Sequence, residues 1–547
     1  MRRRRLLKGF ASLPVVASTA VAANDIPTYA HGVASGDPDN NSVVIWTRVS
    51  GLQKSQPVSW QVALDDNFEQ VVCSGVEVTN QYQDYTVKAV ATGLDSGRDY
   101  FYRFACDGVS SPVGKTRTLP TGQLDKLGLA LASCSNHAFG YFNAYDAIAR
   151  DEAIDFVLHL GDYIYEYGAT GWGAETALSL NRAHTPINEI VSLQDYRERH
   201  AQYKADSDSQ RMHAAKPLLL VWDDHESTNN PWVGGAQNHQ PADEGRWIDR
   251  RDIAIRAYYE WMPIREPNVG AERKNFWRRY QFGNLATLVT LESRHTGRSE
   301  QIDYGDFLDR IQSMDDAKAF KRDVLGAPDR TMISPAMGAF LSSELSRSKA
   351  QGEQWRLIGN AIPMAKTPVP DLASMGITMP DQKATPPGTT ADLVWKGRWS
   401  LPLYPDTWDG YAWAREQFYS LCKQCDVSDL LVLTGDSHSF WANRLTAEDG
   451  QSMGLELGTA GISSPGDFIE QGFDHLSAKK IDEALAQHAP DIRWTSNLYQ
   501  GYVRLILTPS EGRAEYVAMS TVKSRQYSID VVHSESINRN GPSLQFA

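Results

Sequence analysis

The second part of the chain contains five apolar runs, and each run ends in a cluster of polar side chains. The runs cover residues 127–132, 156–160, 217–222, 285–291 and 430–433. They alternate with stretches of helical periodicity, which is typical of an α/β fold. Because α/β folds place their sites at the carboxyl ends of buried strands, we expect the polar clusters to form a site.

The polar clusters are rich in side chains that bind metal ions. They offer a thiol, a phenol, several carboxylates, two imidazoles and an amide, from Cys134, Asp162, Tyr165, Asp223, Asp224, His225, Asn230, Asp436 and His438. Carboxylate oxygens suit trivalent iron or calcium, whereas a thiolate and a phenolate favour iron. Because several anions gathered in one place repel one another and lose solvation, we predict that cations bind between these strand ends.

Each motif taken alone also has a purely structural interpretation. A pair such as Gly161-Asp162 after a strand is usually a turn, and Asp223 with its polar neighbours can cap a helix. The metal hypothesis depends on the number of clusters at successive strand ends. It also depends on local geometry, because Asp162 can bridge two cations with its two oxygens. Asp436 and His438, two residues apart, return to the same face of an extended strand.

The pattern of the chain predicts two folded domains. Strand-like runs separated by turn sequences in the first part predict a β-sandwich whose last corner resembles the fibronectin type. A linker near residues 119–122 separates it from the α/β part. The expected organisation is an export signal over 1–22, a β-sandwich over 28–120, an α/β domain over 126–523 and a polar C-terminal tail over 524–547, with long loops at 168–192 and 366–400.

The N-terminus has the pattern of a targeting segment. Four consecutive arginines precede a mostly apolar stretch, and Ala20-Val21-Ala22 fits a cleavage site. The run RRRLLK at residues 3–8 resembles a twin-arginine export signal, with an ordinary secretory signal as the alternative. We expect an exported protein, periplasmic or secreted, that uses the twin-arginine machinery. No later apolar run is long enough for a transmembrane anchor.

The charge balance of the chain is acidic, with a formal net charge of −13. The first 22 residues contain basic and no acidic side chains, so the remainder is more acidic still. This balance argues against nucleic acid as a stable partner. An anionic substrate remains compatible with it, because bound cations can invert the local field.

The chain has five cysteines, an odd number for an exported protein. Cys73 and Cys106 both fall in the β-rich first part, where they could pair. Cys422 and Cys425 could form a tight local disulfide or stay reduced. Cys134 is then the odd thiol, and it lies at one of the strand ends.

Several motifs match those of a known family. They are HGVASGDP at residues 31–38, ASCSN at 132–136, HLGDYIYE at 159–166, WDDHE at 222–226, LTGDSHSFW at 433–441 and SSPG at 463–466. With them the chain resembles the PhoD-type alkaline phosphatases, relatives of the calcineurin-like and purple acid metallophosphoesterases. The resemblance implies a four-layer metallophosphoesterase β-sandwich flanked by helices, an α/β fold, preceded by a small fibronectin-like all-β domain.

The resemblance also implies an activity and a ligand set. The activity is metal-dependent hydrolysis of phosphate esters outside the cytoplasm, by an alkaline phosphatase with phosphodiesterase activity. The metals are Fe3+, held by Cys134, Asp162 and Tyr165, and Ca2+, held by Asp162, Asp223, Asn230 and Asp436. Asp224 and His438 belong to the same shell without assignment to one metal.

Two further residues are expected to act on the substrate. Arg294 would contact the phosphoryl group, and His225 would donate a proton or hydrogen bond to the leaving oxygen. The run Glu292-Ser293-Arg294 departs from the Asp-Thr-Arg-like run of the family, which leaves the substrate preference open.

Two alternatives compete with this interpretation. One is a phosphodiesterase, similar to a phospholipase D, that acts on lipid or wall-polymer diesters. The other, of a different class, is a surface module that binds metal or phosphate without catalysis. The full set of strand-end ligands argues against the second alternative.

Overall fold

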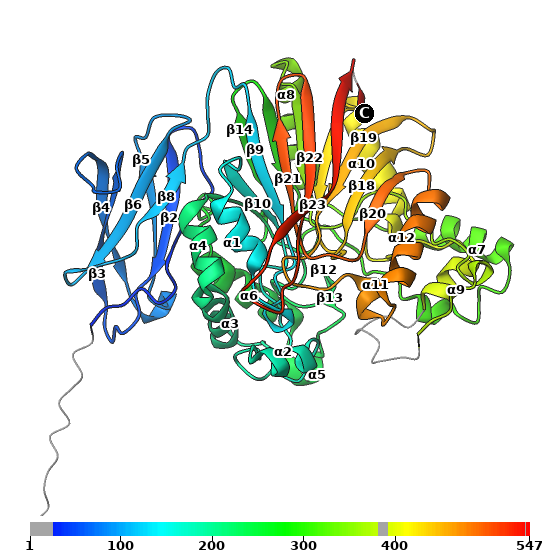
Figure 1. Cartoon of the computed structure of the whole chain (residues 1–547), viewed down its shortest axis with the longest axis horizontal. Coiled ribbons are helices and arrows are strands. Elements are labelled where there is room, and N and C mark those ends of the chain that lie inside the picture. The colour runs from blue at the N-terminus through cyan, green and yellow to red at the C-terminus, as the bar shows by residue number, and fades with distance from the viewer. Residues whose placement is uncertain (1–25, 381–391, 542) are drawn as a thin grey trace, which may run out of the picture.

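The computed structural model describes residues 26–380, 392–541 and 543–547, and shows a mixed α/β architecture with several β-sheets (Figure 1). The predicted export signal over residues 1–22 lies outside the described residues, as do residues 381–391 of the second predicted loop. Among the described helices, none combines the length and the apolar character needed to cross a membrane.

The largest sheet has ten strands, and three parallel strands lie near its centre. These are β9 (Leu127–Ala132), β10 (Phe156–Leu160) and β11 (Leu218–Val221), with β10 between the other two. Every side chain of the three strands is buried. A strand that is covered on both faces needs apolar residues at every position, which explains the continuous apolar runs in the sequence.

A second sheet has seven strands and also carries a parallel core. Its parallel members are β15 (Ala286–Thr290), β16 (Trp355–Gly359), β17 (Leu430–Thr434) and β19 (Ser452–Gly458). The antiparallel members are β14 (Arg279–Phe282) at one edge and β18 (Phe440–Thr446) with β20 (Ile492–Ser496) at the other. The carboxyl ends of the four parallel strands therefore open toward one edge of this sheet.

The two sheets share one apolar core. Leu129 and Leu158 of the ten-stranded sheet belong to the same cluster of buried side chains as Leu288 and Leu357 of the seven-stranded sheet. Burying each such side chain contributes about 1.5–3 kcal/mol relative to leaving it exposed. The helices α8 (Pro335–Ala350) and α10 (Ala412–Gln424) add to this cluster.

The other face of the ten-stranded sheet is covered by helices. Ala130 and Val157, which alternate with Leu129 and Leu158 along their strands, pack against this helical layer. It consists of α1 (Asn143–Arg150), α3 (Leu193–Ala205), α4 (Ser207–Ala215) and α6 (Trp247–Trp261). The predicted α/β class is confirmed.

The N-terminal part is a β-sandwich that shares a sheet with the rest of the chain. β1 (Val33–Gly36), β2 (Ser42–Arg48) and β5 (Thr86–Thr92) extend the ten-stranded sheet, because β1 runs parallel to β11 with Gly36 opposite Leu218. The opposing sheet contains β3 (Gln56–Ala63), β4 (Val71–Thr79), β6 (Asp99–Cys106), β7 (Val109–Ser110) and β8 (Gly114–Arg117). The sandwich lies at the left of Figure 1.

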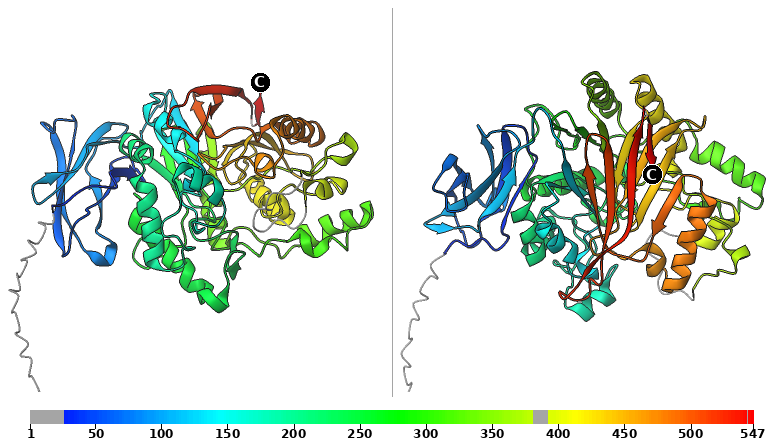
Figure 2. Two further views of the ribbon diagram at one scale, coloured as in Figure 1. Left: turned by 60° about the horizontal axis from the view of Figure 1, so that its bottom comes forward. Right: turned by 45° about the horizontal axis from the view of Figure 1, so that its top comes forward.

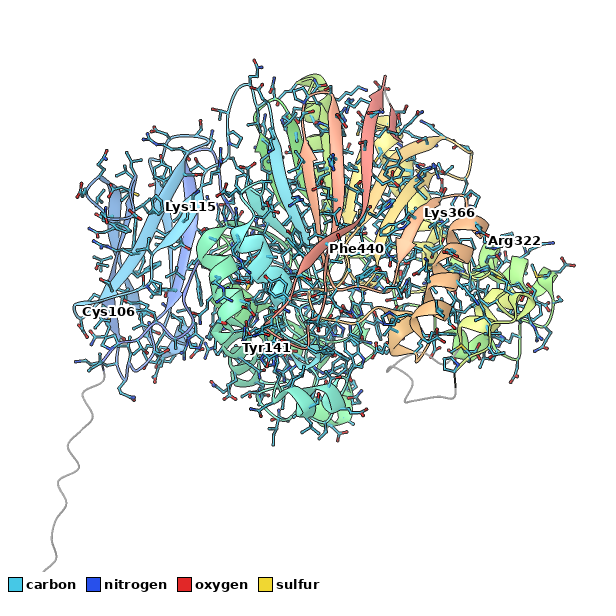
Figure 3. The ribbon with its side chains drawn as sticks, in the orientation of Figure 1. Cys106, Lys115, Tyr141, Arg322, Lys366 and Phe440 are labelled. Carbon is cyan, nitrogen blue, oxygen red and sulfur yellow. The ribbon has the colours of Figure 1, made fainter. Side chains whose placement is uncertain are left out.

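The disulfide that the sequence allowed between Cys73 and Cys106 is absent, since all five cysteines are free. The two residues lie on β4 and β6, and β3 is hydrogen-bonded between these strands. Figure 3 shows Cys106 in the sandwich, far along the molecule from Phe440 at the start of β18. Cys422 and Cys425, at the C-terminal end of α10, are also unpaired.

The prediction of a polar tail over residues 524–547 is wrong, because two strands occupy most of this segment. β23 (Ile529–Asn540) pairs along the length of β22 (Glu511–Met519), and β24 (Ser543–Phe546) follows it. The two strands lie beside β22 and β21 (Gly501–Leu507) in both views of Figure 2. Backbone pairing and the buried side chains of Ile537 and Leu544 hold a segment whose composition is mostly polar.

Candidate metal centre

The parallel strands of both sheets carry the predicted site residues at their carboxyl ends. Cys134 follows β9, Asp162 follows β10 and Asp223 follows β11, whereas Arg294 follows β15 and Asp436 follows β17. These residues form three overlapping groups, and within each group the ligand atoms lie within 4.8 Å of one another. The groups are Cys134 with Asp162 and His438, Asp162 with Asp224 and His225, and Asp223 with Asp224 and Asp436.

Five of these residues have left-handed backbone conformations. The φ angles are 58° at Cys134, 55° at Asp162, 50° at Asn230, 64° at Asp436 and 51° at His438. For residues with a side chain this conformation costs about 1–2 kcal/mol each. Strain of this kind is retained where the surrounding structure over-determines it, and it is concentrated at functional sites.

Cys134, Asp162 and Tyr165 form one end of the centre. Asp162 Oδ2 lies 3.4 Å from Cys134 Sγ and 3.1 Å from Tyr165 Oη. Its second oxygen, Oδ1, accepts from the backbone N–H of His225 at 3.4 Å. The carboxylate of Asp162 thus turns one oxygen toward the thiol and the phenol, and the other toward the backbone of His225.

The acidic groups at this end are disfavoured as anions. Burial, followed by the charge of Asp162, raises the pKa of both Cys134 and Tyr165 well above their ordinary values. Burial also raises the pKa of Asp162. A cation placed among these atoms would reverse all three shifts, since it favours the ionised forms.

Arg294 lies among the acidic residues at the other end of the centre. Its Nε donates to Asp223 Oδ1 at 2.5 Å and its Nη2 to Asp436 Oδ1 at 3.0 Å. Nη2 lies 3.5 Å from Asp224 Oδ1, and Nη1 lies 3.4 Å from Asn230 Oδ1. Burial alone would lower the pKa of Arg294, but the three carboxylates raise it above its ordinary value.

The donors at this end fit additional cations. Asp223 Oδ2 and Asp224 Oδ1 are buried and accept no hydrogen bond, and the only cationic group of the described residues in an ion pair with Asp224 Oδ1 is Arg294, at 3.5 Å. Buried carboxylate oxygens without donors are costly unless a cation meets them. One guanidinium faces three carboxylates here, and an uncharged amide oxygen from Asn230 completes a set of hard oxygen donors of the kind that calcium prefers.

His225 is held by a carboxylate that the sequence analysis left without a role. Its Nδ1 lies 2.6 Å from Glu166 Oε2, and its Nε2 lies 3.9 Å from Asp224 Oδ2. Burial would lower the pKa of His225, but Asp224 and Glu166 raise it well above its ordinary value. Glu166 lies one residue after Tyr165 in the motif at 159–166, which was the available sequence signal.

Two further buried carboxylates fix the backbone around the centre. Glu226 accepts from the backbone N–H groups of Asp162 at 3.0 Å, Tyr163 at 2.5 Å and Asp223 at 2.7 Å. Glu292 accepts from the N–H of Arg294 at 2.9 Å. These carboxylates position the turns that carry the site residues.

A cavity of about 480 Å³ opens above the centre. Asp162, Asp224, His225, Asp436 and His438 form its inner part. Both predicted long loops contribute to its walls, with Trp172 from residues 168–192 and Lys396 from residues 366–400.

Trp172 covers both imidazoles of the centre. Its ring lies 5.7 Å from the ring of His438 and 6.5 Å from that of His225, nearly parallel to both. Its Nε1 donates to Glu470 of α11 (Asp467–Glu470). Trp172 belongs to none of the sequence motifs that pointed to a site.

All ten predicted site residues therefore lie in one cluster. The family model described as PhoD-like phosphatase matches residues 129–516, and the model of its N-terminal domain matches residues 16–120. Alkaline phosphatase D of Bacillus subtilis (strain 168) is 33% identical over 507 residues, which cover 90% of this chain and 77% of that protein.

A solved structure described as "Structure of PhoD" agrees with this result. It is 29% identical to this chain, with a TM-score of 0.75, and the match covers 95% of this chain and 92% of that one. The match spans both the N-terminal sandwich and the part that carries the candidate metal centre. The chain belongs to the PhoD-like phosphatase family, whose members are phosphoric ester hydrolases.

Proposed function

We propose that this chain is an exported alkaline phosphatase that hydrolyses phosphate monoesters and, at the same centre, phosphodiesters. The observation that carries the proposal is the convergence of carboxylates from both sheets on Arg294, beside a thiol and a phenol. Family membership supports metal-dependent hydrolysis of phosphate esters.

The donor set supports two kinds of metal. We infer that Cys134, Asp162 and Tyr165 hold Fe3+, because thiolate and phenolate ligands favour iron. Asp162, Asp223, Asn230 and Asp436 would hold Ca2+ through oxygen atoms, with Asp224 and His438 in the same shell. When bound, these ions supply Lewis-acid polarisation of the phosphoryl oxygens and activation of water.

Arg294 and His225 are the proposed groups of the protein that act on the ester. Arg294 is buried and cationic, and its guanidinium stabilises charge that spreads over the phosphoryl oxygens in the transition state. His225 carries a proton that Glu166 and Asp224 stabilise, and it lines the cavity. It is therefore suited to donate that proton to the leaving oxygen.

The finer fold and location are part of the same proposal. The export signal occupies residues 1–22, the β-sandwich domain 28–120 and the catalytic domain begins near 126, with the C-terminal strands included in it. The two sheets and their outer helices form the four-layer sandwich, which the separate core clusters support. Twin-arginine export to the periplasm or the medium follows from the sequence signal alone.

Hydrolysis of p-nitrophenyl phosphate at alkaline pH tests the proposal. The exported protein should lose activity on chelation and regain it when calcium is added back. Bis(p-nitrophenyl) phosphate, measured in parallel, gives the ratio of monoesterase to diesterase activity. A protein that contains iron and calcium but hydrolyses neither ester would contradict the enzyme proposal and favour a metal-binding module.

A further inference from the structure

The outer part of the cavity is acidic. Five carboxylates line it beyond the candidate metal centre, with Asp406, Asp467 and Glu470 half-buried and Glu300 and Asp303 exposed. An acidic wall is unexpected in an enzyme that receives phosphate esters, because it repels any anionic part of a substrate.

Among the described residues, no arginine or lysine forms an ion pair with Asp406, Asp467, Glu470 or Glu300, although the charge of Lys396 acts on Asp406 and Asp467. Asp467 lies 3.6 Å from Nδ1 of His438, and Glu470 accepts from the indole of Trp172. Asp406 and Glu300 take part in no ion pair within the described parts of the chain. One lysine charge thus faces several carboxylates, so the outer part of the cavity keeps a net negative charge that a cationic ligand can meet.

One basic side chain lines the same wall. Lys396 is buried, and its Nζ donates to the carbonyl oxygen of Leu403 at 2.9 Å. The ammonium also lies 5.8 Å from the ring centre of Tyr304, another residue of the cavity. This wall thus already accommodates one positively charged nitrogen against an aromatic ring and near carboxylates, which is the geometry of a cation–π contact.

Aromatic rings complete the outer part of the cavity. Trp232, Tyr404 and Phe468 line it together with the acids, and Tyr167 and Trp172 lie where it meets His225. Aromatic faces combined with carboxylates bind quaternary ammonium groups and other cations. The inner part suits an anionic phosphoryl group once metal ions are bound, and the outer part suits a cation.

We propose that the outer part of this cavity, lined by Glu300, Asp406, Asp467, Glu470 and aromatic rings, is a subsite for a positively charged leaving group. The preferred substrates are then phosphate esters of amino alcohols and of quaternary ammonium alcohols. This inference rests on the proposed phosphatase function and specifies its substrate class. In the reaction water adds to phosphorus, the P–O bond to the leaving alcohol breaks, and the alcohol departs with one proton.

A pair of isosteric esters tests the subsite. Phosphocholine and 3,3-dimethylbutyl phosphate have the same shape, but the second has a neutral tert-butyl group in place of trimethylammonium. We expect kcat/KM of the metal-loaded protein to favour phosphocholine by about tenfold or more, as one or two cation–π contacts allow. Equal values, or a preference for the neutral ester, would overturn the proposal.

The acids themselves are tested with a double variant. Glu300→Gln with Asp406→Asn should reduce the ratio of the two kcat/KM values toward one, whereas a general loss of folded protein would lower both values equally. Asp315→Asn is the matched control, because this aspartate side chain is 93% exposed and lies outside the cavity. A ratio that the double variant leaves unchanged would argue against the acidic wall as the determinant.

Two further measurements distinguish a failure of the proposed phosphatase function from a failure of the subsite, and compare monoesters with diesters. Hydrolysis of p-nitrophenyl phosphate tests the phosphatase function alone. Hydrolysis of this ester without a preference for phosphocholine would support the phosphatase function and overturn the subsite. A protein that hydrolyses no ester would overturn both proposals. Glycerophosphocholine, measured against its 3,3-dimethylbutyl analogue, shows whether the same preference extends from monoesters to diesters.

Discussion

Arg294 donates Nε to Asp223 Oδ1 at 2.5 Å, and this contact joins the ends of two different sheets. Arg294 follows β15 of the seven-stranded sheet, and Asp223 follows β11 of the ten-stranded sheet. Both side chains are fully buried. The centre is therefore a junction between sheets, and its geometry depends on how the sheets pack.

Replacement of Arg294 by lysine should lower kcat/KM for p-nitrophenyl phosphate by about 100-fold, because one ammonium cannot reproduce the several directed donors of a guanidinium. Arg279→Lys on the edge strand β14 is the matched control, since Arg279 is exposed and lies outside the cavity. A loss of kcat/KM below about threefold would mean that Arg294 does not stabilise the transition state and has a structural role only.

His225→Gln should affect substrates according to their leaving groups. An alkyl phosphate has a poor leaving group and depends on proton donation, so its hydrolysis should slow by about 100-fold. An aryl phosphate leaves as a stable phenolate and should lose much less. Steady-state rates on glycerol phosphate and p-nitrophenyl phosphate provide the comparison, and equal losses on both would count against a proton donor.

Iron held by Cys134 and Tyr165 should colour the protein through ligand-to-metal charge transfer. Cys134→Ser and Tyr165→Phe are each expected to shift or abolish the visible absorption and to lower the iron content. Cys73→Ser, a change at a half-buried thiol of β4 in the N-terminal sandwich, should leave the spectrum intact. An unchanged spectrum in both site variants would remove these residues from the ligand set.

Selectivity for cationic esters should increase with pH. Burial and Asp467 raise the pKa of Glu470 to about 8. Burial lowers the pKa of Lys396 to about 8, against the opposing charges of Asp406, Asp467 and Asp392. As the pH rises through this range, Glu470 becomes charged and Lys396 becomes neutral, so both changes make the outer cavity more negative.

The measurement is the kcat/KM ratio of phosphocholine to 3,3-dimethylbutyl phosphate between about pH 7 and about pH 9, where the phosphate groups of both esters are mainly dianionic. The ratio should increase with pH. In the Glu470→Gln variant the ratio should increase less with pH, because this side chain can no longer become charged. A ratio that falls as the pH rises would contradict the assigned charges.

The strands at the centre could be predicted because their burial leaves a direct mark on the sequence. The predicted runs at residues 127–132 and 156–160 coincide with β9 and β10, whose side chains are all buried. Cys134, Asp162 and Asp436 were found because each directly follows such a run. Their convergence from two sheets needed the motifs of the family, since apolar runs carry no information on which sheet a strand joins.

Other features left no local signal. Glu226 and Glu292 act on backbone N–H groups, one of them 64 residues away in the sequence, so no spacing rule identifies them. β23 is stabilised by pairing with β22, although its composition is that of an exposed segment. Cys73 and Cys106 occur in the same sheet, and only the strand order shows that β3 separates them.

Anomalous diffraction at the iron edge from crystals of the exported protein tests the metal centre most directly. We predict a strong peak in contact with Cys134, Asp162 and Tyr165, and calcium density next to Asp162 on the side of Asp223 and Asp436. Iron located elsewhere in an active protein, or full activity with no metal at these residues, would contradict it.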